Sequence, residues 1–331
     1  MRPPTARPLA TLAFALLAGL LAQAPVHAAP ADVLKAVVGV RAEVPGDART
    51  ADTLGTRRAG TGVVIDSSGL VLTIGYLVVE ASAIELRTAE GAGIPAELVG
   101  YDHDTGFGLV RATAGLGVAP MPLGSSGGVG LGDPLLVVSR AGTPGAIQAK
   151  LVDRREFAGY WEYLLPDALF TAPAMPEFGG AALIDREGRL VGIGSLMVGD
   201  ANGPGIPSPG NMFVPVDALK ERLGDLLAFG RPSGPGHPWL GMTTREIAGH
   251  LVVAGVSADG PAARAGLGPG DILVGVGDQS VSGLADLYRK IWATGEPGVT
   301  VPLKVYRPNG VVELPVSSID RLRWLKLQRS F

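Results

Sequence analysis

The chain has 331 residues, of which 47% are hydrophobic and 18% are charged, and its formal net charge is −3. This charge gives no support for nucleic acid or an anionic membrane as the main partner. The chain has no cysteine, which excludes disulfides, thiolate catalysis and cysteine-ligated zinc. Its 49 glycines and 27 prolines predict many turns and short strands rather than long helices.

The N-terminal residues have the pattern of a signal peptide. Arg2 and Arg7 precede an apolar run from Leu9 to Ala22, and Val26-His27-Ala28 places small residues where a signal peptidase reads. We therefore expect residues 1–28 to be cleaved and the mature chain to be periplasmic, with its net charge changed from −3 to −5 by loss of two arginines. An uncleaved anchor is the alternative. No later segment approaches about 20 uninterrupted apolar residues, so no membrane span is expected after cleavage.

The central part of the chain alternates short apolar runs with glycine-rich turns, which favours an antiparallel β-barrel. The runs expected as strands are 62–65, 70–73, 84–87, 96–99, 108–111, 134–139, 148–152, 181–184, 190–195 and 212–214. Residues 215–227 then change to helical spacing. The glycine- and proline-rich segment 230–238 follows and is expected to be a linker between two domains.

The C-terminal region carries several motifs at PDZ-like positions. Trp239-Leu240-Gly241-Met242 is followed by GPAARAGL at 260–267 and GDIL at 270–273. On these motifs residues 239–320 resemble a PDZ domain of the kind appended to bacterial proteases, with 239–242 as the carboxylate-binding loop. Such a loop presents consecutive backbone N–H groups to a chain-terminal carboxylate, while the adjoining strand edge pairs with the peptide.

The same resemblance predicts the ligand class. Leu240 and Met242 would make the pocket for the terminal residue apolar, so we expect peptides or unfolded proteins that end in a hydrophobic residue. A helix is expected from about Leu284 to Thr294. Its apolar residues are Leu284, Leu287, Tyr288 and Ile291. Each of them could face either the peptide groove or the core.

The region before the linker also carries family motifs. They are GTGVVID at 60–66, SGLVLT at 68–73, AELVGYD at 96–102, GLGDPL at 130–135 and AALIDREGRLVGI at 181–193. This region resembles the protease domain of the HtrA/Deg family. The resemblance implies a mainly β protein, with a trypsin-like double antiparallel β-barrel over 31–229 followed by an α+β PDZ domain. It also implies a homotrimer formed through the N-terminal segment, although residues 31–60 match the family poorly.

The positions that this family uses for catalysis hold other residues here. Tyr76 stands where the resemblance places a histidine, Gly106 where it places an aspartate and Phe178 where it places the serine. Pro176, which has no N–H, stands where the family has an oxyanion donor. A hydroxyl nucleophile needs an oriented base, and a tyrosine with a pKa of about 10 is a poor one. These substitutions predict that the chain is not an enzyme.

Three other features are candidate sites. Ser126, within GSSGG at 124–128, resembles a nucleophile turn, but its register predicts a flexible surface turn. His103 lies between two aspartates and could suggest a metal or a proton-transfer site. Neighbouring loop residues rarely converge on one ion, so neither a metal nor a cofactor is expected. The aromatic residues Tyr160, Trp161 and Tyr163 could bind a partner or pack as a core or lid.

The function predicted from sequence is therefore a noncatalytic periplasmic pseudoprotease. It would bind hydrophobic chain ends through its PDZ domain as a chaperone-like factor, an adaptor or a regulator of another periplasmic protein. Two alternatives remain open: an active serine endopeptidase of the HtrA/Deg family, and a structural subunit of an exported complex.

Overall fold

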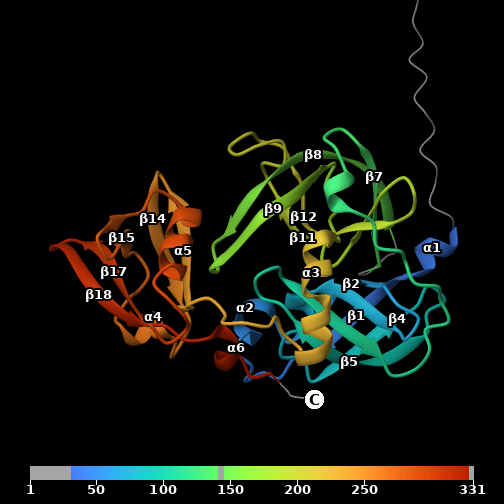
Figure 1. Cartoon of the computed structure of the whole chain (residues 1–331), viewed down its shortest axis with the longest axis horizontal. Coiled ribbons are helices and arrows are strands. Elements are labelled where there is room, and N and C mark those ends of the chain that lie inside the picture. Colours follow the sequence, from blue (N-terminus) through green and yellow to red (C-terminus); the bar gives the residue numbers. More distant parts are fainter. Residues whose placement is uncertain (1–30, 141–144, 328–331) are drawn as a thin grey trace, which may run out of the picture.

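The computed structural model describes residues 31–140 and 145–327. The expected signal peptide, residues 1–28, lies outside these ranges. In the described part of the chain, no helix is both long and apolar enough to cross a membrane. Figure 1 shows two β-barrels beside a smaller third body that contains α5 and the last strands.

The first barrel is closed by six antiparallel strands in the order β1-β2-β3-β6-β5-β4. They are β1 (Val37–Glu43), β2 (Arg57–Val64), β3 (Leu70–Ile74), β4 (Ala83–Arg87), β5 (Gly93–Tyr101) and β6 (Phe107–Ala112). Two short helices flank it, α1 (Ala31–Lys35) and α2 (Ala51–Leu54), and a 3-10 turn, η1 (Gly75–Leu77), follows β3. Closure leaves no unpaired strand edge in this barrel.

The second barrel is closed in the order β10-β11-β12-β9-β8-β7. Its strands are β7 (Pro134–Ser139), β8 (Gly145–Gly159), β9 (Tyr163–Ala172), β10 (Ala182–Ile184), β11 (Leu190–Val198) and β12 (Gly210–Pro215). A 3-10 turn, η2 (Ser126–Gly128), precedes it. The predicted double antiparallel β-barrel is confirmed.

One apolar cluster holds the two barrels together. Phe107 and Leu109 of the first barrel share it with Phe170, Ile193 and Val214 of the second. All five side chains are buried, and burying a side chain of this size stabilises the fold by about 1.5–3 kcal/mol. Because the core crosses between the barrels, the turns at their junction are held in fixed positions.

A helix after the second barrel confirms the predicted helical spacing. α3 (Val216–Phe229) follows Pro215 and buries Val216, Leu219 and Leu226 against the barrels. It ends at Gly230, which has a left-handed backbone and donates its N–H to the carbonyl of Leu226. Glycine suits this position because left-handed backbone costs it little.

The C-terminal domain is a five-stranded antiparallel path, β13-β14-β15-β17-β18, with β16 paired to β15. Its elements are β13 (Met242–Ile247), β14 (His250–Val256), α4 (Pro261–Arg264), β15 (Ile272–Val276), β16 (Gln279–Ser280), α5 (Leu284–Trp292), β17 (Thr300–Arg307) and β18 (Gly310–Ser317). Both helices pack on the sheet through its own apolar cluster. The predicted α+β domain is confirmed.

The chain returns to the first barrel after this domain. α6 (Arg321–Trp324) is followed by Leu325, which packs against Val79 and Tyr101. The N–H of Lys326 donates to Oε1 of Glu80 at 2.7 Å. In Figure 1, α6 accordingly lies beside α2. Residues beyond 320 therefore fasten the C-terminal domain to the first barrel.

The sequence prediction missed part of the second barrel. β8 was expected only over 148–152 but runs from Gly145 to Gly159, and β9 was not predicted. The two strands form a long hairpin that reaches toward α5 (Figure 1). Glu162, at the end of this hairpin, contacts the PDZ loop, which is the predicted carboxylate-binding loop at 239–242.

Candidate functional site

Tyr76, Gly106 and Phe178 are neighbours at the junction of the two barrels. Tyr76 lies in η1, and the N–H of the preceding residue, Gly75, donates to the carbonyl of Gly106 at 2.6 Å. On the other side, a Cβ atom placed on Gly179 would lie 2.9 Å from the Tyr76 hydroxyl. The structure thus brings together the positions that the family resemblance aligned.

The Tyr76 side chain acts there as a hydrogen-bond donor. Its hydroxyl donates to the carbonyl of Ser195 on β11 at 3.0 Å. Burial raises the pKa of Tyr76 above its usual value, so the phenol keeps its proton at neutral pH. Below it, Arg58 donates to the carbonyls of Tyr76 and Val79 at 2.8 and 3.0 Å and fixes the turn.

The Phe178 turn is held by backbone contacts. Its carbonyl accepts from the N–H of Ala181 at 2.9 Å, and the carbonyl of Gly179 accepts from Thr61 at 2.9 Å. Gly180 has φ +75° and packs directly on the carbonyl of Thr61, so no larger residue fits. Pro176 lies exposed at the start of the turn. These contacts hold the turn against Thr61 of β2.

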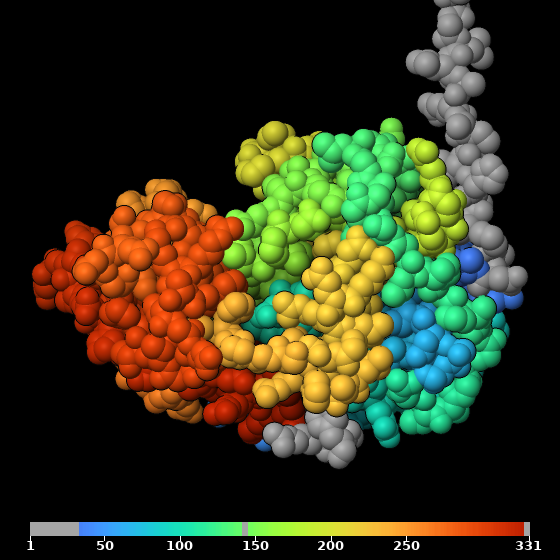
Figure 2. All heavy atoms as spheres, in the orientation of Figure 1, coloured from blue at the N-terminus to red at the C-terminus, as the bar shows by residue number. Residues whose placement is uncertain are grey.

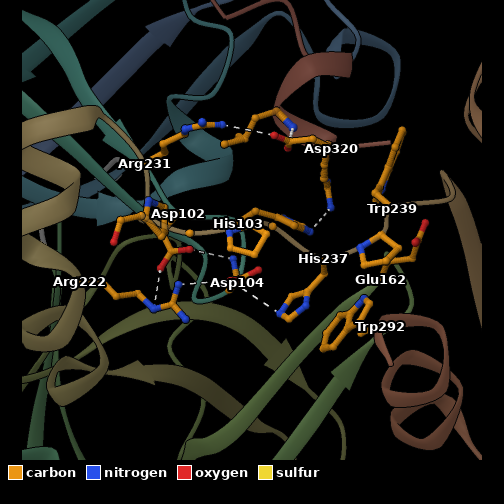
Figure 3. Close-up of a pocket in the computed structure, with 18 residues that line it drawn as sticks. Asp102, His103, Asp104, Glu162, Arg222, Arg231, His237, Trp239, Trp292 and Asp320 are labelled. Atoms are coloured by element: carbon orange, nitrogen blue, oxygen red, sulfur yellow. Dashed lines mark hydrogen bonds and ion pairs between the residues drawn. The ribbon is translucent and has the colours of Figure 1, made fainter. Parts of the chain in front are cut away.

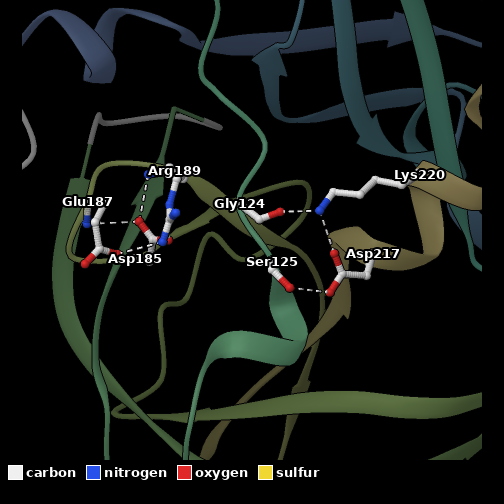
Figure 4. A network of polar contacts seen from close by, with 7 residues as sticks. All are labelled: Gly124, Ser125, Asp185, Glu187, Arg189, Asp217 and Lys220. Carbon is white, nitrogen blue, oxygen red and sulfur yellow. Dashed lines mark hydrogen bonds and ion pairs between the residues drawn. The ribbon is translucent and has the colours of Figure 1, made fainter.

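Ser126 lies in a separate polar network around Asp217, and Figure 4 shows the contacts of Asp217 with Ser125 and Lys220. Its hydroxyl donates to Oδ2 of Asp217 at 2.8 Å, and the same oxygen accepts from Ser125 at 3.1 Å and from the Gly127 N–H at 2.8 Å. Lys220 donates to Oδ1 at 2.7 Å. The turn predicted to be flexible is instead anchored to α3.

The electrostatics of this network make Asp217 a weak base. Although burial raises the pKa of Asp217, the hydrogen bonds from Lys220, Gly127 and the two serines outweigh it and hold the pKa below its usual range. Ser126 itself is 1% exposed. The cluster is suited to fixing α3 against η2.

His103 lies beside a cavity of about 250 Å³ between the first barrel, the linker and the C-terminal domain (Figure 3). Its Nε2 accepts from Nη1 of Arg321 at 2.6 Å, and its Nδ1 lies 3.3 Å from the Tyr101 hydroxyl. Because a guanidinium can only donate, Nε2 carries no proton and the ring is neutral. Burial and the Arg321 charge hold the pKa of His103 well below its usual value.

The aspartates beside His103 are engaged by the protein itself. Asp104 pairs with Arg222 at 3.2 Å, and Asp102 lies 3.6 Å from the same guanidinium. Asp102 also accepts from the hydroxyl of Thr105 at 2.6 Å. His103 therefore joins the first barrel to Arg321, and the two carboxylates join the same barrel to α3.

The PDZ loop holds a carboxylate. Consecutive backbone N–H groups of Leu240, Gly241 and Met242 donate to the side chain of Glu162 at 2.9, 2.7 and 2.9 Å. Glu162 comes from the second barrel, between β8 and β9, and lies beside Trp239 in Figure 3. Burial raises the pKa of Glu162, against the opposing effect of these N–H groups and of Arg321.

Glu162 is held in an unusual conformation. It is 3% exposed, and its backbone has φ 58°, which is left-handed for a residue with a side chain. Such a conformation costs about 1–3 kcal/mol and persists only where the surrounding contacts determine it. The sequence offered no signal for this residue, because its partners lie in another domain.

Position 241 requires glycine. Its backbone has φ +77°, and an added Cβ would lie 2.9 Å from Cη2 of Trp239 and 3.3 Å from Ser257. Trp239 is buried and its ring contacts that of Trp324 at 4.9 Å between centroids. The indole therefore cannot move away easily, and the loop shape depends on the glycine.

The residues predicted on α5 divide between two roles. Leu287 and Ile291 are fully buried in the core of the domain, and Leu284 packs against that core while partly exposed. Tyr288 is also buried, but its hydroxyl reaches the hairpin and donates to the carbonyl of Gly159 at 2.7 Å. Tyr288 thus contacts the β8–β9 hairpin as well as the core of its own domain.

Comparison with known proteins agrees with this architecture. A model of the trypsin-like peptidase domain matches residues 60–193, and a model of the PDZ domain matches residues 238–317. A probable periplasmic serine endoprotease DegP-like from Brucella suis biovar 1 (strain 1330) is 28% identical over 277 residues, covering 78% of this chain and 52% of that protein. Serine endoprotease DegS from Escherichia coli (strain K12) is 25% identical over 279 residues, covering 79% and 76%. The chain spans about half the length of the DegP-like relatives it matches.

Solved structures show the same fold. The HtrA-type protease AlgW with tripeptide superposes with a TM-score of 0.52 at 23% identity, covering 90% of this chain and 96% of that one. The serine endoprotease from Yersinia pestis has a TM-score of 0.51 at 21% identity, covering 87% and 95%.

These relatives contradict one prediction. The expectation that the chain is not an enzyme is wrong by this comparison, because the relatives are named serine endoproteases. Tyr76, Gly106 and Phe178 had carried that expectation. The named activity favours the alternative, an active serine endopeptidase.

The order of the domains in this chain and the names of its relatives point to the same family. In this chain a trypsin-like peptidase domain is followed by a PDZ domain, and its relatives include DegP-like proteins and DegS. In this order of domains, the chain is similar to the proteases of the HtrA/Deg family.

Proposed function

We propose that this chain recognises polypeptides by their free carboxyl ends, through the PDZ loop at 239–242, as the binding step of an HtrA/Deg-type endopeptidase. The observation that carries the proposal is the set of three consecutive N–H groups, on Leu240, Gly241 and Met242, that converge on one carboxylate. Hydrogen bonds to an ionised acceptor are about twice as strong as neutral ones. A chain end offers the same chemical group as the Glu162 side chain.

The surroundings of the loop favour a hydrophobic final residue. Leu240 and Met242 are buried in the apolar cluster of the domain, which also contains Leu287 and Ile291. β13 begins in the loop and offers a strand edge for the rest of a peptide. One structural neighbour is an HtrA-type protease solved with a tripeptide, which supports the same use here.

Calorimetric titration tests this recognition. The whole chain is titrated with a decapeptide that ends in valine and with the same peptide ending in aspartate. We expect the valine peptide to bind at least about tenfold more tightly, because a charged side chain would be desolvated without a partner. Equal affinities, or a preference for aspartate, would reject the proposed ligand class.

Serine endopeptidase activity is the second candidate function, favoured by the names of the relatives. Hydrolysis by a serine needs a base within hydrogen-bond reach. The Tyr76 hydroxyl is engaged with the carbonyl of Ser195, and Ser126 faces the weak base Asp217. The nucleophile of such an activity is therefore the residue to identify.

Reduced casein is the substrate for that experiment. The purified chain and its Ser126→Ala variant are incubated with casein, and each is treated with a fluorophosphonate that labels reactive serines. Cleavage with a labelled serine would support the endopeptidase and identify its nucleophile. Cleavage lost in Ser126→Ala would assign Ser126. Intact casein with no label on either protein would reject this candidate.

We further propose a periplasmic location. The DegP-like relatives are named periplasmic, and the N-terminal pattern of two arginines and an apolar run supports export. Osmotic-shock fractionation with N-terminal sequencing should find the mature protein in the periplasm, beginning at Ala29. Light scattering on that material tests the trimer implied by the family resemblance.

A further inference from the structure

The tip of the β8–β9 hairpin lies in the PDZ groove. The carbonyl of Tyr160 accepts from the N–H of Thr244 on β13 at 2.8 Å. The carbonyl of Gly159 accepts from the hydroxyl of Tyr288 on α5 at 2.7 Å. The hairpin tip therefore bridges the strand and the helix between which a PDZ domain receives peptide. Figure 2 shows yellow-green atoms of the second barrel against the orange C-terminal domain.

Glu162 completes this occupation. Oε2 accepts from Leu240, and Oε1 accepts from both Gly241 and Met242, so all three loop donors are used by one side chain. The contact is nearly dry, since Glu162 is 3% exposed. Backbone pairing with the strand and a carboxylate in the loop are the two contacts that a chain end makes there. The hairpin supplies both from within the chain.

We infer that Glu162 is an internal ligand of the PDZ loop, which competes with chain-terminal carboxylates and closes the groove until the hairpin leaves. This inference rests on the proposed function of the same loop. Each loop N–H can donate one strong hydrogen bond, and two carboxylates at one position repel each other. A polypeptide end must therefore displace Glu162, and the Tyr160 carbonyl must release β13.

The hairpin is docked over a wider area than its tip. Ala158 and Leu164 pack against the apolar cluster of the PDZ domain. Glu156 forms an ion pair with Arg289 on α5, and Arg321 donates to the carbonyl of Trp161 at 3.3 Å. Binding of a chain end is thus linked to undocking of a strand pair that belongs to the second barrel.

The test compares wild type with two variants of the whole chain. Glu162→Gln keeps the size of the side chain but removes the charge and one acceptor oxygen. Asp167→Asn removes a charge from the same hairpin, where the carboxylate pairs with Arg154 of the hairpin itself, and is the matched control. A labelled decapeptide that ends in valine is titrated by fluorescence polarisation, with its C-terminal amide beside it.

We expect Glu162→Gln to bind the free-acid peptide at least about tenfold more tightly than wild type, and Asp167→Asn to differ from wild type by less than about threefold. Equal affinities of wild type and Glu162→Gln, with the acid preferred over the amide, would overturn the internal ligand and leave the proposed function intact. If neither protein distinguished the acid from the amide, the proposed function would fail, and the inference with it.

Hydrogen exchange on wild type gives a reading that does not depend on a variant folding. The N–H of Glu162 donates to the Tyr288 hydroxyl at 3.3 Å in the docked state. Saturating peptide should speed exchange over residues 159–163, because the displaced hairpin loses its partners. Unchanged exchange there, with peptide bound, would overturn the inference.

Discussion

Nη1 of Arg321 lies 2.6 Å from Nε2 of His103, and this contact joins the end of the PDZ domain to the first barrel. The same guanidinium donates to the carbonyl of Trp161 at the hairpin tip. Arg321 therefore contacts both the first barrel and the β8–β9 hairpin, which together hold the PDZ domain in place. Since it can only donate, the contact requires the neutral form of His103.

The neutral state of His103 predicts a pH dependence of stability. Burial and Arg321 lower the pKa of His103 in the folded chain, while in the unfolded chain it is about 6.5. As pH falls, the unfolded state therefore protonates His103 at a higher pH than the folded state does. The free energy of unfolding should then decrease below about pH 6.5, by up to about 1.4 kcal/mol per pH unit. Melting temperatures from pH 8 down to about pH 5 should show this loss.

The control for this prediction is a second histidine. His103→Gln should flatten the dependence below about pH 6.5, whereas His250→Gln, at an exposed position, should leave it unchanged. An identical slope in wild type and His103→Gln would show that His103 is not the group responsible.

Gly241→Ala should destabilise the PDZ loop more than the same change at Gly249. Both glycines have φ +77°, so the backbone cost of alanine is shared. An added Cβ meets the Trp239 ring at position 241 and open space at position 249. The difference in free energy of unfolding, measured in urea, should be about 1–3 kcal/mol. Equal losses would mean that the Trp239 contact is not constraining.

Glu80→Ala should loosen the attachment of the C-terminal segment. The carboxylate of Glu80 is 1% exposed and accepts from the backbone of Arg49, Thr50 and Lys326, as well as from the Thr50 hydroxyl. Leaving such donors unpaired costs about 1–3 kcal/mol. We expect a urea midpoint shifted by that amount, with faster proteolysis near Lys326. The exposed Glu90→Ala is the control, and an equal effect there would contradict this account.

Asp217→Ala should release the turn around Ser126 from α3. Three donors, on Ser125, Ser126 and Gly127, would lose their shared acceptor. A stability loss of about 2 kcal/mol is expected. Glu221→Ala, on the same helix and exposed, should change stability by less than about 0.5 kcal/mol. If the two variants melted alike, the network would contribute nothing to the fold.

Local pattern predicted most of the barrels and of the PDZ domain. β3 is a run of five buried residues beside a turn, and α3 repeats apolar residues at helical spacing, so both were visible in the sequence. β8 was shortened in the prediction because charged residues fill its second half, from Asp153 to Glu156, where most side chains are half-buried. Such a strand lacks the strict alternation of polar and apolar residues.

The side chain that occupies the PDZ loop could not be predicted from the sequence. Leu240, Gly241 and Met242 were recognised as a carboxylate-binding loop, and the structure places a carboxylate there. The residue that supplies it, Glu162, lies 78 positions earlier than Leu240 and in another domain. Nothing local marks Glu162 as a ligand, because only the docking of the two domains brings them together.

The most direct measurement is the affinity of one peptide in two forms. A labelled decapeptide ending in valine, as the free acid and as the C-terminal amide, is titrated with wild type and with Glu162→Gln. If the loop at 239–242 binds chain-terminal carboxylates, both proteins should prefer the acid by at least about tenfold. Equal binding of acid and amide would contradict the account.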